Sequence, residues 1–168
     1  GALGDSSFNL GGSNSLQAGN SFGFGNQLAS ADGNSYAILF GHNNNSLATH
    51  SYGFGQDLTL SSKYCFAFGL GSNALSYMEI VMGHFSTVYT PNSTVAFDLG
   101  DRLFTIGNGA SHPSRSDAMI VLKSGLITAP SMTMSMIDSG SAKTLLTNAW
   151  FSANIPAAAG VQYKRAIE

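Results

Sequence analysis

Histidine side chains are the groups in this 168-residue chain best suited to binding a metal ion or carrying a proton near neutral pH. His42 and His84 each directly follow a glycine and, in the repeat described below, occupy the same position three copies apart. Equivalent histidines of three associated chains could form two layers of imidazoles that hold an anion or a metal. Isolated histidines are more often solvent-exposed turn residues. We therefore predict no cofactor and no metal site, and keep His42 and His84 as weak candidates for metal ligands.

Carboxylates, serines and the single cysteine give no pattern typical of an enzyme. The nine aspartates and glutamates include no close recurring pair, so a glycosidase acid and nucleophile are not visible within one strand, although they could meet across chains. No G-x-S-x-G elbow is present, and the glycine-rich stretches GFGNQ and GLGSN lack the Lys-Ser/Thr of a phosphate-binding loop. Cys65 alone can form neither an internal disulfide framework nor a cysteine zinc cluster.

Charged residues gather between positions 98 and 123 of a chain in which only 10% of residues are charged. One interpretation is that Arg102 and Arg115 form a clasp between chains by pairing with Asp101 or Asp117. The alternative is that these side chains only keep the surface soluble. We favour the clasp, because charges are rare elsewhere in the chain.

A repeat of about fourteen residues organises the first part of the chain. Its most regular mark is a glycine that follows a bulky residue, and successive marks are 14, 16, 14, 14 and 14 residues apart: Gly11, Gly25, Gly41, Gly55, Gly69 and Gly83. A weaker copy without the glycine ends at Phe97. The two extra residues of the longer step lie near the turn sequence Asp32-Gly33-Asn34, where a lengthened corner would accommodate them.

Residues alternate in character within each copy, as they do along a β-strand. Smaller residues such as Ala37, Cys65 and Ala67 occupy one face. Bulky side chains occupy the other face just before each glycine, and those predicted to form a trimer interface are Phe22, Phe24, Ile38, Phe40, Tyr52, Phe54, Phe66, Phe68, Ile80 and Met82. Each copy therefore predicts two strands and two tight corners. Fourteen residues cannot bury a core alone, so the copies must stack.

The two faces of these strands predict different environments. The small residues fit the inside of a narrow roll, and the bulky residues then point outward. A continuous apolar stripe of this size marks an interface, and closed cyclic symmetry would bury it without leaving an open end. The low charge content agrees, since a globular domain usually carries about 25% charged residues. Glu79 falls in the inward column, where it either needs a partner or marks a distorted copy.

The repeat unit S-x-G-x-G or A-x-G, followed by alternating Asn, Ser, Ala and Leu, resembles the head repeat of YadA-type trimeric autotransporter adhesins. Similar repeats occur in bacteriophage tail fibres. The resemblance covers about residues 3–97 and implies a left-handed parallel β-roll, an all-β solenoid in which three chains pack side by side. It also implies that the bulky column lies along the trimer axis. The family usually has alanine before the final glycine, whereas several copies here have phenylalanine.

Two later segments resemble phage tail and related surface-fibre proteins. The stretches DRLF-IGNG and RSDAM-VLK-G, within residues 100–130, are similar to the segment that closes such repeats. The stretch KTLLTNAWFSAN, residues 143–154, is similar to tail-protein sequence and predicts a short helix. The expected organisation is a β-roll at residues 1–97, a neck-like closing β segment at 98–129 and a C-terminal extension with a short helix at 130–168.

Together these features predict a non-enzymatic structural and binding module of a homotrimeric fibre, either a phage tail fibre or a bacterial surface adhesin. It would lie outside the cell and attach to a protein or glycan on a cell surface. The formal net charge of −2 gives no basic surface for nucleic acid, and no apolar run of about twenty residues predicts a membrane span. Two enzymes remain as alternatives: a trimeric tailspike polysaccharide depolymerase and, less favoured, a left-handed β-helix acyltransferase, whose repeat has six residues.

Overall fold

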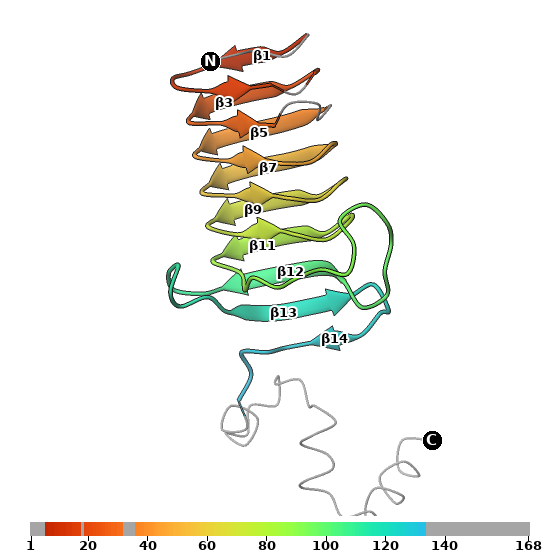
Figure 1. Ribbon diagram of the computed structural model, residues 1–168. Helices are drawn as coiled ribbons and strands as arrows, with labels where there is room; N and C mark the ends of the chain where they lie inside the picture. Colours follow the sequence, from red (N-terminus) through yellow and green to blue (C-terminus); the bar gives the residue numbers. More distant parts are fainter. Residues whose placement is uncertain (1–5, 18, 32–35, 134–168) are drawn as a thin grey trace, which may run out of the picture. The chain divides into compact units, whose positions relative to one another are not determined.

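The computed structural model describes residues 6–17, 19–31 and 36–133 of the chain (Figure 1). The chain divides into two compact units, Gly1–Ser131 and Met132–Glu168. All of the described strands lie in the first unit, which is all-β. The helix expected at residues 143–154 lies outside the described residues. Within the described ranges, no helix is long and apolar enough to cross a membrane.

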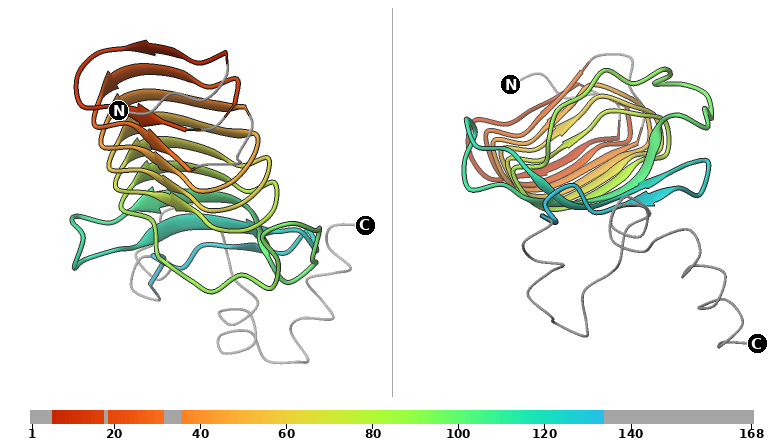
Figure 2. Two further views of the ribbon diagram at one scale, coloured as in Figure 1. Left: turned by 45° about the horizontal axis from the view of Figure 1, so that its top comes forward. Right: turned by 90° about the horizontal axis from the view of Figure 1, so that it is seen from below.

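The strands form a β-solenoid with two sheets, as the alternating repeat predicts. In the large sheet, parallel strands follow one another in chain order: β1 (Phe8–Leu10), β3 (Phe22–Asn26), β5 (Ala37–His42), β7 (Ser51–Gln56), β9 (Phe66–Leu70), β11 (Ile80–His84) and β12 (Arg102–Asn108). The small sheet contains β2 (Ser15–Leu16), β4 (Ala29–Ser30), β6 (Asn45–Ser46), β8 (Thr59–Leu60) and β10 (Asn73–Ala74). One strand of each sheet and two corners make one coil. Figure 2 shows the coils superposed along the stack.

The register of the large sheet places the repeat glycines in one column. Gly41 pairs with Gly25 on one side and with Gly55 on the other. The long step also has the predicted position: Ser15 pairs with Ala29 fourteen residues on, whereas Phe22 pairs with Ile38 sixteen residues on. The two extra residues therefore lie after Ala29 and before Ile38, in the corner that was expected to be longer.

Steric contact with the next coil explains why glycine holds this column. Gly55 has a φ of 148°, and a Cβ added to it would lie 1.9 Å from the carbonyl oxygen of Gly69. Any other residue would therefore combine an unfavourable backbone conformation with an impossible contact. The seventh copy, expected to end at Phe97, does not form a coil of the stack. No described strand lies between His84 and Arg102, and Gly107 of β12 pairs with Gly83 instead.

The interior of the solenoid combines leucines on the side of the small sheet with mostly smaller residues from the large sheet, where Leu39 is a larger exception. Leu16, Leu28, Leu58 and Leu60 are fully buried or nearly so. Opposite them, a Cβ added at Gly53 would lie 2.9 Å from Leu60 Cδ1, which is closer than side chains can approach. The small inward column is therefore the space that the leucines fill, and the bulky residues of the same strands must face outward.

Each coil turns through two corners, and a corner residue with positive φ recurs every seven residues, except for the nine-residue step from Gln27 to Tyr36 that contains the two extra residues. The first corner leads from the large sheet to the small sheet and has this conformation at Ser13, Gln27, Asn43, Asp57, Gly71 and Phe85. The second corner leads back to the large sheet and has it at Ser6, Asn20, Tyr36, His50, Tyr64 and Met78. The φ values at these twelve positions range from 41° to 65°.

Antiparallel strands end the parallel stack. Strand β13 (Asp117–Leu122) pairs with β12, and β14 (Ile127–Thr128) pairs with β13. Before β12, residues 85–101 form a long loop that lies against the second corner, where the Lys63 and Tyr77 amides donate to the carbonyls of Thr94 and Ser93, both at 3.1 Å. The strands at residues 102–128 therefore extend the large sheet.

Candidate functional site: the outer face of the large sheet

The ten residues predicted to lie at a trimer interface all point out from the large sheet. The register joins them into two columns, one through Ile38, Tyr52 and Phe66 and one through Phe40, Phe54 and Phe68. All ten are exposed or half-buried in the single chain, whereas the residues between them, such as Ala37, Leu39, Cys65, Ala67 and Val81, are fully buried. Phe24 and Phe68 keep 49% and 50% of their surface exposed.

Aromatic rings on this face stack from one coil to the next. The rings of Phe8 and Phe22 and those of Phe40 and Phe54 occupy equivalent positions and stack with centroids 4.9 Å and 5.1 Å apart. The rings of Phe54 and Phe66 belong to different columns and are tilted, with centroids 5.6 Å apart. Adjacent strands of a sheet are about 4.8 Å apart, so equivalent rings meet at stacking distance. These ring contacts join the aromatic side chains of successive coils into one apolar surface. We call this surface, made by the ten residues, the outer face.

The outer face has the chemistry of a contact surface. None of its side chains is charged, and Tyr52 carries its only polar group. Apolar patches of more than a few hundred Å² are rare on monomeric proteins and mark interaction sites. This arrangement can therefore bury apolar surface of a partner, but it offers no acid, base or nucleophile for a reaction.

The candidate histidines His42 and His84 are the last residues of strands β5 and β11. Residues pair in the series His42, Gln56, Leu70 and His84, so His42 and His84 share one column, as the repeat predicts. Both are exposed. His84 Nδ1 lies 2.7 Å from the carbonyl oxygen of Gly109, and its ring packs against Phe85 with the centroids 4.5 Å apart. Among the described residues, no group of three or more His, Cys, Asp or Glu could hold a metal ion.

Arg102 and Asp117 meet within one chain. Arg102 Nη1 lies 3.5 Å from Asp117 Oδ2, and the guanidinium also donates to the carbonyl of Thr87 at 3.0 Å and to its hydroxyl at 2.8 Å. The same guanidinium lies over the Tyr89 ring, 4.2 Å from its centroid. Asp117 is buried and accepts hydrogen bonds from the Thr87 amide at 3.0 Å and from the Thr87 hydroxyl. This pair joins β12 and β13 to the start of the long loop.

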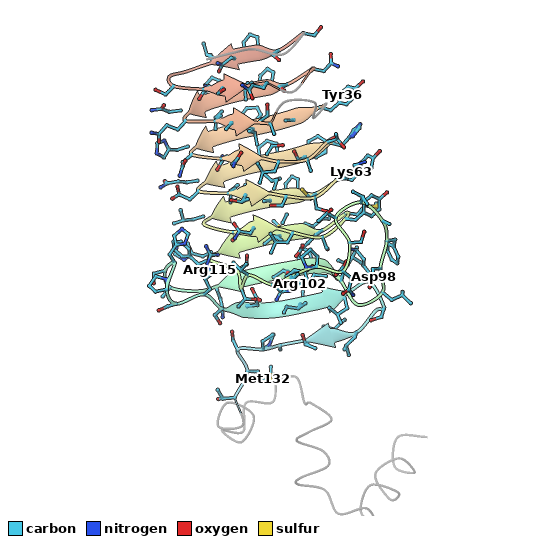
Figure 3. All side chains as sticks on the ribbon, in the orientation of Figure 1. Tyr36, Lys63, Asp98, Arg102, Arg115 and Met132 are labelled. Carbon is cyan, nitrogen blue, oxygen red and sulfur yellow. The ribbon has the colours of Figure 1, made fainter. Side chains whose placement is uncertain are left out.

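Asp101 and Arg115 also bind backbone groups of their own chain. The Asp101 carboxylate accepts hydrogen bonds from the amides of Asn92 at 2.7 Å and Ser93 at 3.0 Å. Arg115 Nη1 donates to the carbonyls of Gly71 at 2.7 Å and Ser86 at 2.8 Å. A clasp between chains through these residues stays a prediction. Figure 3 shows Arg115 at the opposite edge of the stack from Tyr36 and Lys63.

Glu79 has partners that were not identified from the sequence. Its carboxylate is fully buried, and Oε2 accepts hydrogen bonds from the amides of Leu75 and Ser76, both at 2.8 Å, while the Tyr89 hydroxyl lies 3.4 Å away. Burial raises the pKa of Glu79, and the two backbone hydrogen bonds oppose this shift only in part. The spacing Ser76-x-x-Glu79, in which a carboxylate reaches back to amides three and four residues earlier, was the available signal.

A buried lysine lies near this carboxylate. Lys123 Nζ donates to the hydroxyl of Ser76 at 3.0 Å and lies 5.8 Å from the centroid of the Phe97 ring. Burial lowers the pKa of Lys123, and the nearby carboxylates of Asp101 and Glu79 oppose that shift. Polar groups thus end the apolar interior where the last parallel coil meets the closing strands.

Comparison with protein-family models, curated proteins and solved structures finds no match for this chain. The fold and the outer face therefore define the class: an all-β solenoid with parallel coils of about fourteen residues and a continuous aromatic surface on its large sheet.

Proposed function

We propose that this chain is a non-enzymatic module of a homotrimeric fibre that attaches to a cell surface, as phage tail fibres and bacterial surface adhesins do. In this proposal the coils run left-handed, and the outer face of each chain is buried in a contact between the chains. The module acts outside the cell and binds a surface protein or glycan.

The outer face is the observation that carries the proposal. It runs without interruption over β3, β5, β7, β9 and β11, and it leaves half of Phe24 and of Phe68 exposed in the single chain. Fully burying such a side chain is worth about 1.5–3 kcal/mol relative to full exposure, so one that is half exposed gains about half of this on association. Ten of them on one surface supply a strong driving force for association. Three parallel chains then present every receptor contact three times, which raises avidity without any new contact.

The carboxylates of the closing strands support a structural role over polysaccharide cleavage. Glu79, Asp101 and Asp117 are all buried, and each accepts hydrogen bonds from backbone amides of its own chain. A glycosidase needs two carboxyl groups that flank the bond to be cleaved, one of which can donate a proton to it. Incubation with capsular polysaccharide tests this choice, since released oligosaccharide would support the depolymerase and contradict the proposed function.

Molecular mass in solution, measured by light scattering, tests the trimer. The wild-type protein is expected to have the mass of three chains. Replacing two exposed residues of the outer face, Phe24→Glu together with Phe68→Glu, is expected to give the mass of one chain, because two buried carboxylates per chain would oppose association. Gln27→Asn, an exposed change at the first corner, is the matched control and should keep three chains. A wild-type protein that is a folded monomer would contradict the proposal.

A further inference from the structure

The second corner carries bulky side chains in a backbone conformation that does not favour them. Tyr36, His50, Tyr64 and Met78 have φ values of 65°, 55°, 58° and 57°. Non-glycine residues seldom adopt this region, and asparagine and aspartate are the ones that tolerate it best. Four successive coils therefore accept a conformational cost at the same place.

The first corner shows that the backbone does not require such residues. It has the same conformation at Gln27, Asn43 and Asp57, with φ values of 51–56°. Their side chains are polar and serve the turn: Asn43 Nδ2 donates to Asp57 Oδ1 at 2.6 Å, which joins one coil to the next. The second corner has the same conformation at Ser6 and Asn20, and the first corner has a bulky residue only at Phe85. The backbone conformation therefore does not account for the bulky side chains of Tyr36, His50, Tyr64 and Met78.

Stacking within the chain uses only part of these side chains. The His50 ring lies between the rings of Tyr36 and Tyr64, with centroids 4.8 Å and 4.6 Å away. Even so, Tyr36, Tyr64 and Met78 keep 49%, 48% and 46% of their surface exposed. The second corner therefore exposes ring edges and a thioether to solvent in the single chain. We call Tyr36, His50, Tyr64 and Met78 the ladder.

The long loop extends this surface toward the closing strands. The loop is fixed to the second corner by the hydrogen bonds from Lys63 and Tyr77 described above, and its next residues expose large apolar side chains at Val95, Phe97 and Leu99. The ladder also adjoins the outer face, because each ladder residue precedes a residue of that face by two positions, as Tyr64 precedes Phe66. We call the combined surface of Tyr36, His50, Tyr64, Met78, Val95 and Phe97 the corner surface.

A ring of three identical chains needs two different surfaces on each chain, because each subunit contacts one neighbour with one surface and the other neighbour with another. The proposed function supplies one of them, the outer face. We propose that the corner surface is the second, and that it packs against the outer face of the next copy of this chain. This inference rests on the proposed trimer. Both surfaces expose large aromatic and aliphatic side chains, so contact between them would bury apolar surface on both chains.

Two variants separate the surfaces. Tyr36→Asn together with Tyr64→Asn removes the tyrosine rings of the corner surface, and asparagine suits the positive φ, so folding is not impaired. Phe24→Glu together with Phe68→Glu removes the outer face. Each variant alone is expected to have the mass of one chain by analytical ultracentrifugation, with cooperative thermal unfolding as proof of folding. Gln27→Asn, the same kind of change at the first corner, is expected to keep three chains.

Mixing the two variants tests the pairing itself. In the mixture, the intact corner surface of one variant can bind the intact outer face of the other, and growth must stop there. A species of two chains is therefore expected, and neither variant alone should form it. If the wild-type protein is trimeric and the corner variant, measured separately, is also trimeric, this inference is wrong and the proposed function still stands. A corner variant that is monomeric but forms no two-chain species in the mixture would also overturn it. Monomeric wild type would instead overturn the proposed function.

Discussion

Glycine at the repeat mark shows how one residue position governs the whole stack. At Gly25, Gly41, Gly55 and Gly69 the φ values lie between 115° and 148°, and an added Cβ would come within 1.8–1.9 Å of the carbonyl of the next glycine. The column is thus the place where backbone passes closest to backbone between coils. At Phe97, where the fourteen-residue count continues without the glycine, the chain has already left the stack.

Gly55→Ala should therefore destabilise the protein by at least about 2 kcal/mol, since it adds backbone strain to an overlap that neither coil can relieve. Gly19 is the matched control, because a Cβ there meets no atom within 4 Å and its φ is not in the positive range. Urea unfolding of the two variants measures the difference. An equal and small effect of Gly55→Ala and Gly19→Ala would contradict the steric explanation.

Two structural elements, the last regular coil and the closing strands, meet at a buried polar cluster. Glu79 belongs to the coil, the Tyr89 hydroxyl comes from the long loop, and Lys123 follows β13. The carboxylate is held by backbone amides and has its pKa raised by burial. The junction therefore depends on an ionisable group that the folded state prefers to keep protonated.

The free energy of unfolding should fall as pH rises through the range in which Glu79 loses its proton. The folded state has the higher pKa, so between the ordinary value of 4.5 and the raised value it binds more protons than the unfolded state. Glu79→Gln removes this dependence, so its stability relative to wild type should increase as pH rises above the ordinary pKa of 4.5.

Asp57→Asn provides a control of opposite sign. The hydrogen bond from Asn43 lowers the pKa of Asp57, so this carboxylate stabilises the fold above its unfolded pKa and loses that effect as pH falls. The stability of Asp57→Asn relative to wild type should therefore decrease as pH rises. Chemical unfolding at several pH values measures both slopes. The same slope for the two variants would show that Glu79 does not titrate as its burial indicates.

Elements of the repeat were predictable from sequence because their signal is local and occurs six times. The alternation around Phe54 and the glycine spacing gave the strands, their register and the direction of each side chain. The role of Asn44 was not predictable in this way, since it depends on the next coil. Its amide donates to the Phe40 and Gly55 carbonyls at 2.8 Å and 2.9 Å, and its oxygen accepts from the Leu58 amide at 3.1 Å.

The closing strands departed from the repeat for a similar reason. Arg102 and Asp117 were expected to act between chains because the sequence shows that charges cluster but not which loop they contact. The 17-residue loop at 85–101 supplies the partners: Thr87 binds Arg102 and Asp117, and the amides of Asn92 and Ser93 bind Asp101. Contacts between non-equivalent elements do not recur along the sequence, so no periodic pattern predicts them.

At the scale of the whole molecule, the chain has few charged residues, and two kinds of trimer contact can be compared. One would use the uncharged outer face and corner surface, and the other would use Arg102 and Arg115 as a clasp between chains. In the single chain both arginines already donate to groups of their own chain, at 2.7–3.0 Å. The geometry therefore favours apolar contact over the charged clasp as the basis of the proposed trimer.

Salt distinguishes these assemblies in one measurement. At about 1 M ionic strength the screening length is only about 3 Å, so partly exposed ion pairs between chains weaken, whereas apolar contacts do not. The mass of three chains, measured by light scattering at low protein concentration, should persist from low salt to 1 M NaCl. Sodium sulfate, which strengthens apolar burial, should shift dissociation to still lower protein concentration. A trimer that separates into single chains in NaCl would instead identify the charged clasp as the dominant contact, and the outer face would then lose its place in assembly.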